Sequence, residues 1–312
     1  MISVQDLVKK YGSFVAVDHL SFEVERGELF GLLGPNGAGK TTTISVLSTL
    51  LPADGGTVVV AGCDVGRDPG GVRRRIGMVP QEIALYEDLS ARDNLRFWGQ
   101  LYGLSGSSLH TRVDELLEAV ELTEHGRQRV SRFSGGMKRR LNLAAGLMHG
   151  PEVLFLDEPT VGIDAQARSK ILDLIRRLND DGLTVLYTTH YLEEAEQLCD
   201  RIGVIDQGRL AALGDKDELI RQIGDEDTIR FVLPPEAFDD LVAAAAAWGA
   251  IGDPEIRRGR VVLRVVDGGR ALPQLQAWLE ARDLPLAHLE IERPNLENLY
   301  LNLTGRALRE TT

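Results

Sequence analysis

Residues 34–41 read GPNGAGKT, a run in which glycines are followed by a lysine and a threonine. An apolar stretch, Leu29–Leu33, precedes this run, and Thr41–Leu51 after it has helical character. Glycines at this spacing let backbone N–H groups face an anion at the positive end of the following helix. In that setting Lys40 would reach the β and γ phosphates of a nucleotide, and the Thr41 hydroxyl would ligate Mg²⁺. The pattern predicts a nucleoside triphosphate site rather than a merely flexible turn.

The stretch VLFLDE, Val153–Glu158, is apolar until it ends in two adjacent carboxylates. Alone this pattern is weak, because any buried strand can end in an aspartate. In a chain that also has a phosphate-binding loop earlier in its sequence, an aspartate such as Asp157 is typical of a residue that holds Mg²⁺ and its coordination shell. Glu158 could accept the proton of an attacking water, and the alternative is a solvated or helix-capping carboxylate. We expect a metal ligand and a general base at these positions.

Isolated polar and aromatic residues are weaker candidates. Gln81, in GMVPQE, could orient water or contact Mg²⁺, but a single glutamine is usually a surface residue. His190 ends TVLYTTH, where strands of a parallel sheet present ligand-contacting groups, and the alternative is a hydrogen-bonded core histidine. Tyr11 could stack on a flat base, although an aromatic on an N-terminal strand is more commonly part of the core.

A second glycine-rich run, FSGGM, covers Phe133–Met137. Ser134, Gly135 and Gly136 read as the N-cap and first turn of a helix, where a hydroxyl and backbone N–H groups converge as they would around an anion. An ordinary capped helix with glycines for close packing is the alternative. Nothing in the sequence obliges this helix to fold back on the phosphate loop of its own chain. If it binds phosphate, we expect that phosphate to belong to another molecule's site.

The pattern of apolar and polar residues along the chain predicts an α/β domain. Val4–Glu28 alternates apolar and polar residues, which is typical of antiparallel strands. Apolar strands at Thr57–Ala61, Val153–Leu156 and Thr184–Thr189, with a helix at Ala165–Asn179, indicate a mostly parallel sheet. Between about residues 85 and 150 the sequence predicts a helical insertion. Its expected helices are Ala91–Tyr102, Leu109–Leu122 and Ser134–Met148.

A second, smaller domain is expected over residues 226–312, after a first domain of residues 1–225. Its elements read strand, helix, strand, strand, helix, strand, which is the order of a ferredoxin-like α+β fold. A last amphipathic helix is expected from Asn295, because Leu296, Leu299, Tyr300 and Leu303 share one face.

Composition excludes several classes of function. The net charge of −12 disfavours binding to nucleic-acid backbones or anionic lipid. Two basic runs, Arg73–Arg75 and Lys138–Arg140, lack interleaved aromatics and are interpreted as solvated faces. The cysteines, Cys63 and Cys199, show no pairing or metal-ligand pattern. No apolar run reaches membrane-helix length, and the N-terminus lacks the apolar core of a signal peptide. We expect a cytosolic chain unless a partner holds it elsewhere.

Residues 1–225 resemble the nucleotide-binding subunit of ATP-binding cassette (ABC) transporters, whose motifs recur here in family order. They are Walker A at Gly34–Thr41, the Q-loop at Gln81, the signature at Ser134–Gly136, Walker B ending at Asp157, the catalytic Glu158, the D-loop around Asp164, the switch His190 and an adenine-stacking Tyr11. The resemblance implies that ATP is contacted by Gly34, Pro35, Asn36, Gly37, Ala38, Gly39, Lys40, Thr41, Thr42 and Asp164, and Mg²⁺ by Thr41, Gln81 and Asp157.

The resemblance also implies a fold and an assembly. The fold is a P-loop NTPase (RecA-like) core with an N-terminal antiparallel β subdomain and a helical subdomain, followed by the small ferredoxin-like domain. In this family two cassettes face head to tail, so that each ATP lies between the Walker A of one copy and the signature of the other. Ser134, Gly135 and Gly136 would then bind the ATP of a second copy of the chain, which explains why one chain carries two glycine-rich runs.

The family's usual LSGGQ reads FSGGM at Phe133–Met137, so Met137 stands where the family has glutamine, while Ser134 and both glycines, which carry the phosphate contacts in the family, remain. This variant, and the stretch RPNLENLYLNLTG at residues 293–305, are similar to drug-resistance-type exporters with ABC-2 permeases. That subgroup implies a separately encoded integral membrane permease, no nucleic-acid partner and a location at the cytoplasmic face of the cell membrane.

The alternative function is a soluble ABC ATPase acting on ribosomes or DNA, but such proteins tend to carry two cassettes or large insertions. A small P-loop kinase would leave Ser134–Gly136 and the C-terminal domain without a role.

Overall fold

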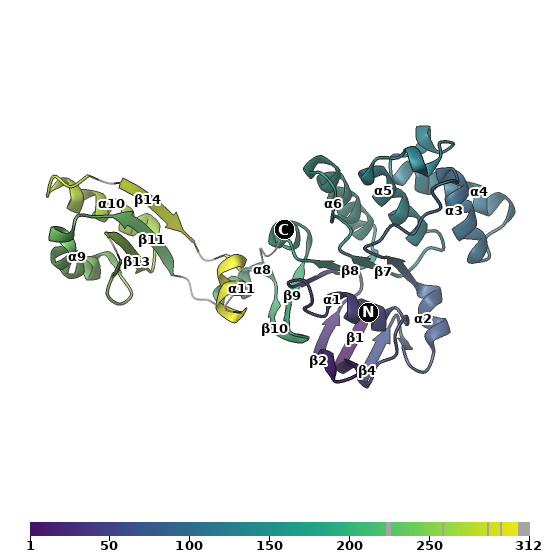
Figure 1. The fold of residues 1–312 in the computed structure, drawn as a ribbon, viewed down its shortest axis with the longest axis horizontal. Coiled ribbons are helices and arrows are strands. Elements are labelled where there is room, and N and C mark those ends of the chain that lie inside the picture. The colour runs from purple at the N-terminus through teal and green to yellow at the C-terminus, as the bar shows by residue number, and fades with distance from the viewer. Residues whose placement is uncertain (223–225, 258, 286, 294, 305–312) are drawn as a thin grey trace. The chain divides into compact units, whose positions relative to one another are not determined.

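A computed structural model describes residues 1–222, 226–257, 259–285, 287–293 and 295–304 (Figure 1). Its contacts divide into two units, Met1–Lys216 and Asp217–Ala307. The division falls between Lys216 and Asp217, whereas the sequence suggests a boundary after residue 225; residues 223–225 lie outside the described residues. Each unit has its own hydrophobic core.

The central sheet of the first unit has the strand order β10-β9-β3-β8-β7-β6. Its strands are β10 (Arg209–Gly214), β9 (Arg201–Asp206), β3 (Leu29–Leu33), β8 (Thr184–Thr189), β7 (Val153–Asp157) and β6 (Ile76–Val79). All pairs are parallel except β9 with β10. The strands β3, β7 and β8 are buried along their whole length, as their continuous apolar sequences predict, so the parallel α/β core is confirmed.

An antiparallel sheet of order β2-β1-β4-β5 packs beside this core. Its strands are β2 (Phe14–Val24), β1 (Ile2–Tyr11), β4 (Gly55–Val60) and β5 (Cys63–Asp64). The prediction that Thr57–Ala61 belongs to the parallel sheet is wrong, because β4 pairs antiparallel with β1 through Val4 and Val58. A short apolar run does not show whether the neighbouring strand in its sheet is parallel or antiparallel to it. The parallel edge strand β6 was not predicted, since it is brief and follows the basic run Arg73–Arg75.

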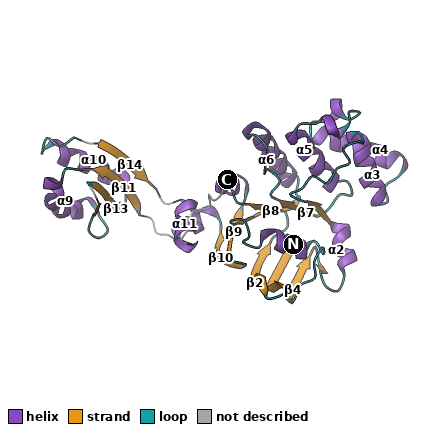
Figure 2. Ribbon diagram, in the orientation of Figure 1, coloured by secondary structure: helices purple, strands orange, loops and turns teal. Residues whose placement is uncertain are grey.

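Helices cover the parallel sheet and form the insertion (Figure 2). Those of the core are α1 (Lys40–Leu47), α2 (Pro69–Arg75), α6 (Ala165–Asp180) and α7 (Leu192–Leu198). The short helix α8 (Lys216–Arg221) spans the division between the two units. The insertion holds α3 (Ala91–Leu101), α4 (Gly106–Ala119) and α5 (Gly135–Gly146), with short 3₁₀ turns at Thr123–His125 and Val130–Arg132. Its apolar faces share one core with α6 and β7, which confirms the helical subdomain.

The second unit has the sheet order β12-β13-β11-β14, all antiparallel. Its strands are β11 (Asp227–Val232), β12 (Glu255–Arg257), β13 (Arg260–Val265) and β14 (Ala287–Glu292), and its helices are α9 (Phe238–Ala245), α10 (Gly268–Glu280) and α11 (Leu296–Thr304), with 3₁₀ turns at Pro235–Ala237 and Ala246–Trp248. Trp248 and Trp278 meet edge to face at 5.7 Å in its core. The predicted ferredoxin-like order is confirmed.

The expected closing stretch, residues 293–305, includes residues 294 and 305, which lie outside the described residues. The predicted apolar face of α11 is largely buried at Leu296, Leu299 and Tyr300. Within the described part of the chain, no helix is both long enough and apolar enough to span a membrane.

We predict that a chain ending at residue 222 folds and retains nucleotide binding, because the cores of the first unit draw on residues of that unit alone. Circular dichroism and ATP titration of the truncated chain measure both properties. A truncated chain that is folded but does not bind ATP would mean that the second unit completes the nucleotide site.

Candidate nucleotide-binding site

The predicted phosphate loop connects β3 to α1 in a conformation that needs glycine at defined positions. Gly37 and Gly39 have positive φ angles of 81° and 104°, a region that other residues rarely adopt. A Cβ on Gly34 would lie 2.3 Å from the carbonyl oxygen of Ile205, and one on Gly39 would lie 2.6 Å from that of Ala16. The loop therefore lies against neighbouring backbone so closely that side chains are excluded.

Backbone hydrogen bonds hold the loop against the sheet. The Gly34 N–H donates to the carbonyl of Thr189 at 3.2 Å, and the Gly208 N–H donates to that of Ala38 at 2.9 Å. Gly208 lies in the turn between the antiparallel strands β9 and β10. The loop is thus fixed from both sides before α1 begins.

Lys40, the first residue of α1, is buried beneath the loop. Its Nζ donates to the carbonyls of Gly34 at 2.7 Å and Pro35 at 3.0 Å. The same Nζ lies 2.9 Å from Oε1 of Glu158, and the exposed fractions of the two side chains are 4% and 7%. A charge pair this deeply buried is costly to break, because removing one partner leaves the other uncompensated.

Asp157 ends β7 and faces the start of α1 across β8. Its Oδ1 accepts hydrogen bonds from the hydroxyls of Thr41 at 3.2 Å and Thr188 at 2.7 Å. Burial raises the pKa of Asp157, and these hydrogen bonds only partly offset it. Thr188 was not predicted, although the pair of threonines that ends TVLYTT, directly before His190, is a usable signal.

The oxygens of Thr41 and Asp157 match the chemistry of Mg²⁺, which prefers hard oxygen ligands. Among the described residues there is no cluster of three or more His, Cys, Asp or Glu side chains able to hold a metal ion by themselves. Mg²⁺ in nucleotide sites is usually held by one or two protein oxygens together with phosphates and water, so this donor set fits the ion.

Glu158 follows in a strained backbone conformation. Its φ is 45°, and its N–H donates to the carbonyl and hydroxyl of Thr188 at 3.2 Å and 3.0 Å. Non-glycine residues in this region cost about 1–3 kcal/mol and are common at functional sites. The turn directs the carboxylate back toward Lys40 on one side and His190 on the other.

Two neighbouring groups keep Glu158 ionised. Nδ1 of His190 lies 3.0 Å from Oε2 of Glu158. Burial raises the pKa of Glu158, but the hydrogen bond with His190 and the charge of Lys40 outweigh it, so the pKa lies below its usual value. The structure therefore brings Lys40, Glu158 and His190 together. The two adjacent carboxylates have opposite pKa shifts.

Other sequence candidates lie apart from this cluster. Tyr11 ends β1 and is 49% exposed, Ser134 caps α5, and the Asp164 carboxylate caps α6 by accepting from the Ala167 N–H at 2.8 Å. Gln81 is exposed after β6. In the described part of the chain, no hydrogen bond or ion pair joins these side chains to Lys40, Thr41, Asp157 or Glu158.

The expectation that the run Lys138–Arg140 is a solvated face is wrong for its central residue. Arg139 is only 8% exposed, and its guanidinium donates to the carbonyls of Gln81 and, at 3.2 Å, Val161. The helix that begins at Ser134 is therefore tied to the segment after β6 and to the turn after Glu158. The charge of a residue alone did not reveal that its side chain turns inward.

Comparison with known proteins identifies the family. A family model described as ABC transporter matches residues 17–161. The linearmycin resistance ATP-binding protein LnrL of Bacillus subtilis is 45% identical over 312 residues, which cover 99% of this chain and 100% of that protein. The chain belongs to the ABC transporter family.

Further relatives agree with this assignment. The doxorubicin resistance ATP-binding protein DrrA of Mycobacterium tuberculosis is 42% identical over 97% of this chain and 93% of its own length. The Nod factor export ATP-binding protein I of Ralstonia nicotianae is 38% identical over 99% of this chain and 95% of its own length. These names support the predicted likeness to drug-resistance exporters.

Solved structures agree as well. An ATP-binding subunit of an ABC transporter is 31% identical, with a TM-score of 0.65 over 72% of this chain and 93% of that one. A dimeric ATP-binding cassette, solved in a post-hydrolysis state with ADP and Pi, is 26% identical with a TM-score of 0.63 over 69% of this chain and 98% of that one. The chain is an ATP-binding ABC ATPase, and the comparisons favour a transporter subunit over the soluble alternative.

We predict opposite effects of neutralising the two carboxylates on the stability of the protein without nucleotide. Asp157→Asn should raise the free energy of unfolding at pH 7, because the raised pKa of Asp157 means that its charged form is penalised by folding, while an amide oxygen can still accept from Thr41 and Thr188. Glu158→Gln should lower it by about 3 kcal/mol, because Lys40 loses its buried partner.

Urea unfolding measures both effects, and pH separates them. The advantage of Asp157→Asn should shrink as acid protonates Asp157, since the penalty is complete above the raised folded pKa and vanishes below the pKa of the unfolded chain. The contribution of Glu158, whose pKa is lowered, should be lost only as pH falls through that depressed pKa. Equal destabilisation by both substitutions would contradict the opposite electrostatics assigned to them.

Proposed function

We propose that this chain hydrolyses MgATP at sites shared between two copies of itself and so drives a separate membrane permease, as in an ABC-2 type exporter. The observation that carries the proposal is the contact between the phosphate-loop lysine and the candidate general base, Lys40 with Glu158 at 2.9 Å. A lysine that contacts phosphates and a base that contacts the attacking water must both lie beside the γ-phosphoryl group.

Lys40 has two competing anionic partners in this proposal. Its Nζ pairs with Oε1 of Glu158, and the phosphates of ATP would draw the ammonium away. That exchange frees Oε1 to accept the proton of an attacking water, while His190 continues to hold Oε2. The base therefore becomes available only when a nucleotide has engaged Lys40.

Thr41, Asp157 and Gln81 are the proposed Mg²⁺ contacts. The metal would neutralise charge on the transferring phosphate. Thr188 orients the Asp157 carboxylate by donating to Oδ1, which leaves Oδ2 for a ligand or for ordered water. Gln81 is connected to this region through Arg139, which contacts both its carbonyl and that of Val161. The exposed ring of Tyr11 is the proposed stacking surface for adenine.

Ser134, Gly135 and Gly136 are proposed to bind the ATP of the second copy. Ser134 and Gly135 are exposed at the N-terminus of α5, and the only partner of the Ser134 hydroxyl among the described residues is the Met137 N–H of the same helix, at 3.3 Å. Gly136 is held against α6, since a Cβ there would lie 2.6 Å from the Cβ of Ala167. Asp164 begins that same helix, which brings the D-loop beside the signature.

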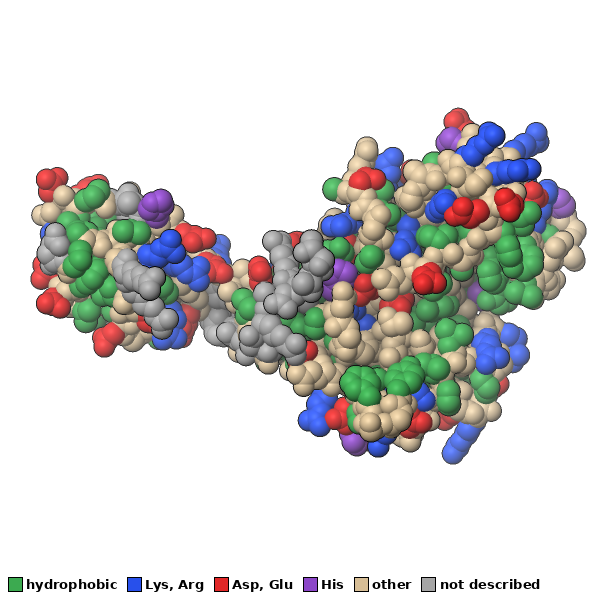
Figure 3. Space-filling model, in the orientation of Figure 1, with side chains coloured by type: hydrophobic (Ala, Val, Ile, Leu, Met, Phe, Trp, Pro, Cys, Tyr) green, Lys and Arg blue, Asp and Glu red, His purple; other side chains and the backbone are tan. Residues whose placement is uncertain are grey.

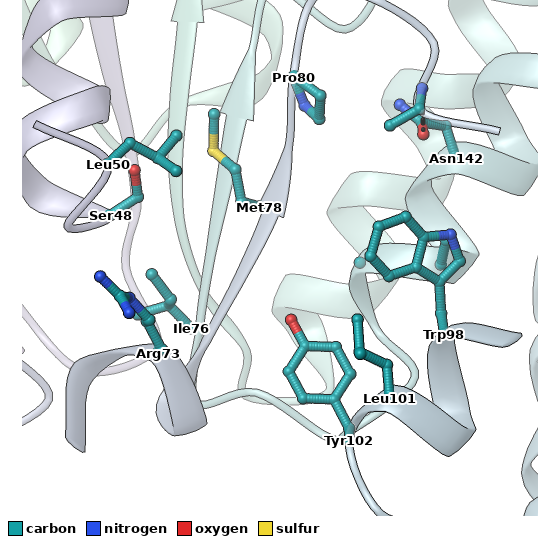
Figure 4. A pocket seen from close by; sticks show the side chains of 13 residues that line it. Ser48, Leu50, Arg73, Ile76, Met78, Pro80, Trp98, Leu101, Tyr102 and Asn142 are labelled. Atoms are coloured by element: carbon teal, nitrogen blue, oxygen red, sulfur yellow. Dashed lines mark hydrogen bonds between the residues drawn. The ribbon is translucent and has the colours of Figure 1, made fainter. Parts of the chain in front are cut away.

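A groove beside the helical subdomain is the proposed contact with the permease. It has a volume of about 410 Å³ and lies between Leu50, Ile76 and Met78 on one side and Trp98, Leu101 and Tyr102 on the other (Figure 4). Leu50 and Leu101 are 66% and 65% exposed. Hydrophobic side chains also gather between the helical subdomain and α2 on the face drawn in Figure 3. Exposed apolar surface of this kind marks an interaction site.

Export is proposed as the direction because the relatives are named for antibiotic resistance or for Nod factor export. Attachment to a permease would hold the chain at the cytoplasmic face of the cell membrane. The transported molecule would be determined by the permease.

We predict that Glu158→Gln binds ATP but hydrolyses it at least about a hundredfold more slowly, since a general base typically contributes that much. Phosphate release and equilibrium ATP binding are measured on the full chain. Glu152→Gln is the matched control: Glu152 pairs with Arg26 and Arg75 at the surface, so its loss should leave turnover unchanged. Turnover of Glu158→Gln near that of the wild type would remove Glu158 from its role.

We predict that mixing a Lys40→Ala chain with a Ser134→Arg chain restores one working site. In a head-to-tail dimer both defects fall in the same site, and the other site keeps an intact phosphate loop and an intact signature. ATP-dependent dimer formation is measured by light scattering for each variant alone and for the mixture. If the mixture forms no more ATP-bound dimer than the single variants, the sites are not shared between copies.

A further inference from the structure

A buried carboxylate that was not predicted as a site residue, Glu194, follows His190 by four positions in the chain. Glu194 is in the first turn of α7 and is 2% exposed. Its Oε2 accepts from the hydroxyls of Tyr187 and Thr189, each at 2.7 Å, and its Oε1 accepts from the hydroxyl of Thr160 at 2.7 Å. Burying a carboxylate is expensive, and a network this fully connected makes the local geometry rigid.

One arm of this network, a chain of hydrogen bonds through Thr189, connects the two residues that flank His190. The Thr189 hydroxyl donates to Glu194 and accepts from the Tyr191 N–H at 2.9 Å, so it bridges the residues on either side of His190. Because the Thr189 hydroxyl donates its proton to the Glu194 carboxylate, its oxygen is left to accept from the Tyr191 N–H, and this second hydrogen bond closes the turn. The backbone direction of His190 therefore depends on a side-chain hydroxyl that Glu194 orients.

A second arm reaches His190 through a guanidinium and an aromatic ring in contact with each other. Nε of Arg168, on α6, lies 3.4 Å from Oε1 of Glu194, and its guanidinium lies 4.5 Å from the centre of the Tyr191 ring. That ring in turn lies 4.1 Å from the ring of His190. The imidazole thus contacts the Tyr191 ring as well as Glu158, and a charged group of the network lies against that ring.

The protonation of Tyr187 is consistent with a fixed network. Burial, and then the charge of Glu194, raise the pKa of Tyr187 well above its usual value. Its hydroxyl therefore stays a donor to Glu194 across the physiological range. The carboxylate keeps the same donors whether or not His190 changes its charge.

We propose that Glu194 is a positioning residue for ATP hydrolysis: through the Thr189 hydroxyl and the Tyr191 ring it holds His190 at hydrogen-bonding distance from Glu158. This inference rests on the proposed roles of His190 and Glu158. It assigns Glu194 no contact with nucleotide, so its loss acts on turnover and leaves the affinity for ATP unchanged. A displacement of about 1 Å in a reacting group can cost a factor of about a hundred in rate.

The test uses Thr189→Val in the full-length chain, because Glu194→Ala would leave buried donors without a partner and could unfold the protein. Valine keeps the shape of Thr189 and removes the hydroxyl bridge. We expect kcat to fall about tenfold or more and KM for ATP to stay within about twofold. Thr160→Val is the matched control, because it removes a hydroxyl from the same carboxylate on the arm that does not lead to His190. It should keep kcat near that of the wild type.

A chain that already carries His190→Ala distinguishes the loss of His190 positioning from general damage to the fold. In a His190→Ala chain, adding Thr189→Val should cause no further loss of kcat, because the group it positions is already gone. Any of three results would overturn the inference. They are an unchanged kcat for Thr189→Val, equal losses of kcat for Thr189→Val and Thr160→Val, and a further loss of kcat when Thr189→Val is added to His190→Ala. His190→Ala and Glu158→Gln alone test the proposed function: wild-type turnover in both would overturn that function and the inference with it.

Discussion

The buried ion pair of Lys40 and Glu158 is the interaction on which the site depends. Both side chains are almost fully removed from water, and an unpaired charge in such a place costs several kcal/mol. The lysine must therefore always have an anionic partner, which is Glu158 within the chain and phosphate in the proposed reaction. In the proposed reaction this single requirement couples nucleotide binding to the release of the candidate general base, and no moving segment is needed to explain the coupling.

The order of the strands in the central sheet brings Lys40 and Glu158 together and places the residues that hydrogen-bond around them. Because β8 lies between β3 and β7, its last residues fill the space between the phosphate loop and the carboxylates. Thr188 orients Asp157 and supports the strained backbone of Glu158, while Thr189 contacts Gly34 through its carbonyl and Glu194 through its hydroxyl. Adjacent carboxylates consequently have different environments: Asp157 has a raised pKa that burial dominates, and Glu158 has a lowered pKa because cationic and hydrogen-bonding neighbours prevail.

Local signals made the core of the site predictable from sequence. In two places a buried strand is followed directly by candidate functional residues: Leu29–Leu33 by GPNGAGKT, and Val153–Leu156 by Asp157 and Glu158. Short-range patterns therefore suffice to predict these candidates. The missed features are non-local: the antiparallel partner of β4, the short β6, the inward turn of Arg139 and the network around Glu194 depend on segments far apart in the chain. Charge and hydropathy carry no information about which distant group a side chain meets.

The claim that this ATPase drives a membrane permease is tested most directly by purifying tagged chain from gently solubilised membranes of its native cell and identifying bound proteins by mass spectrometry. We expect a polytopic membrane protein in stoichiometric amount, which is lost when Leu101→Glu places a charge in the apolar groove. Recovery of the chain only from the soluble fraction, bound to ribosomes or to nothing, would contradict the transport function and leave the ATPase.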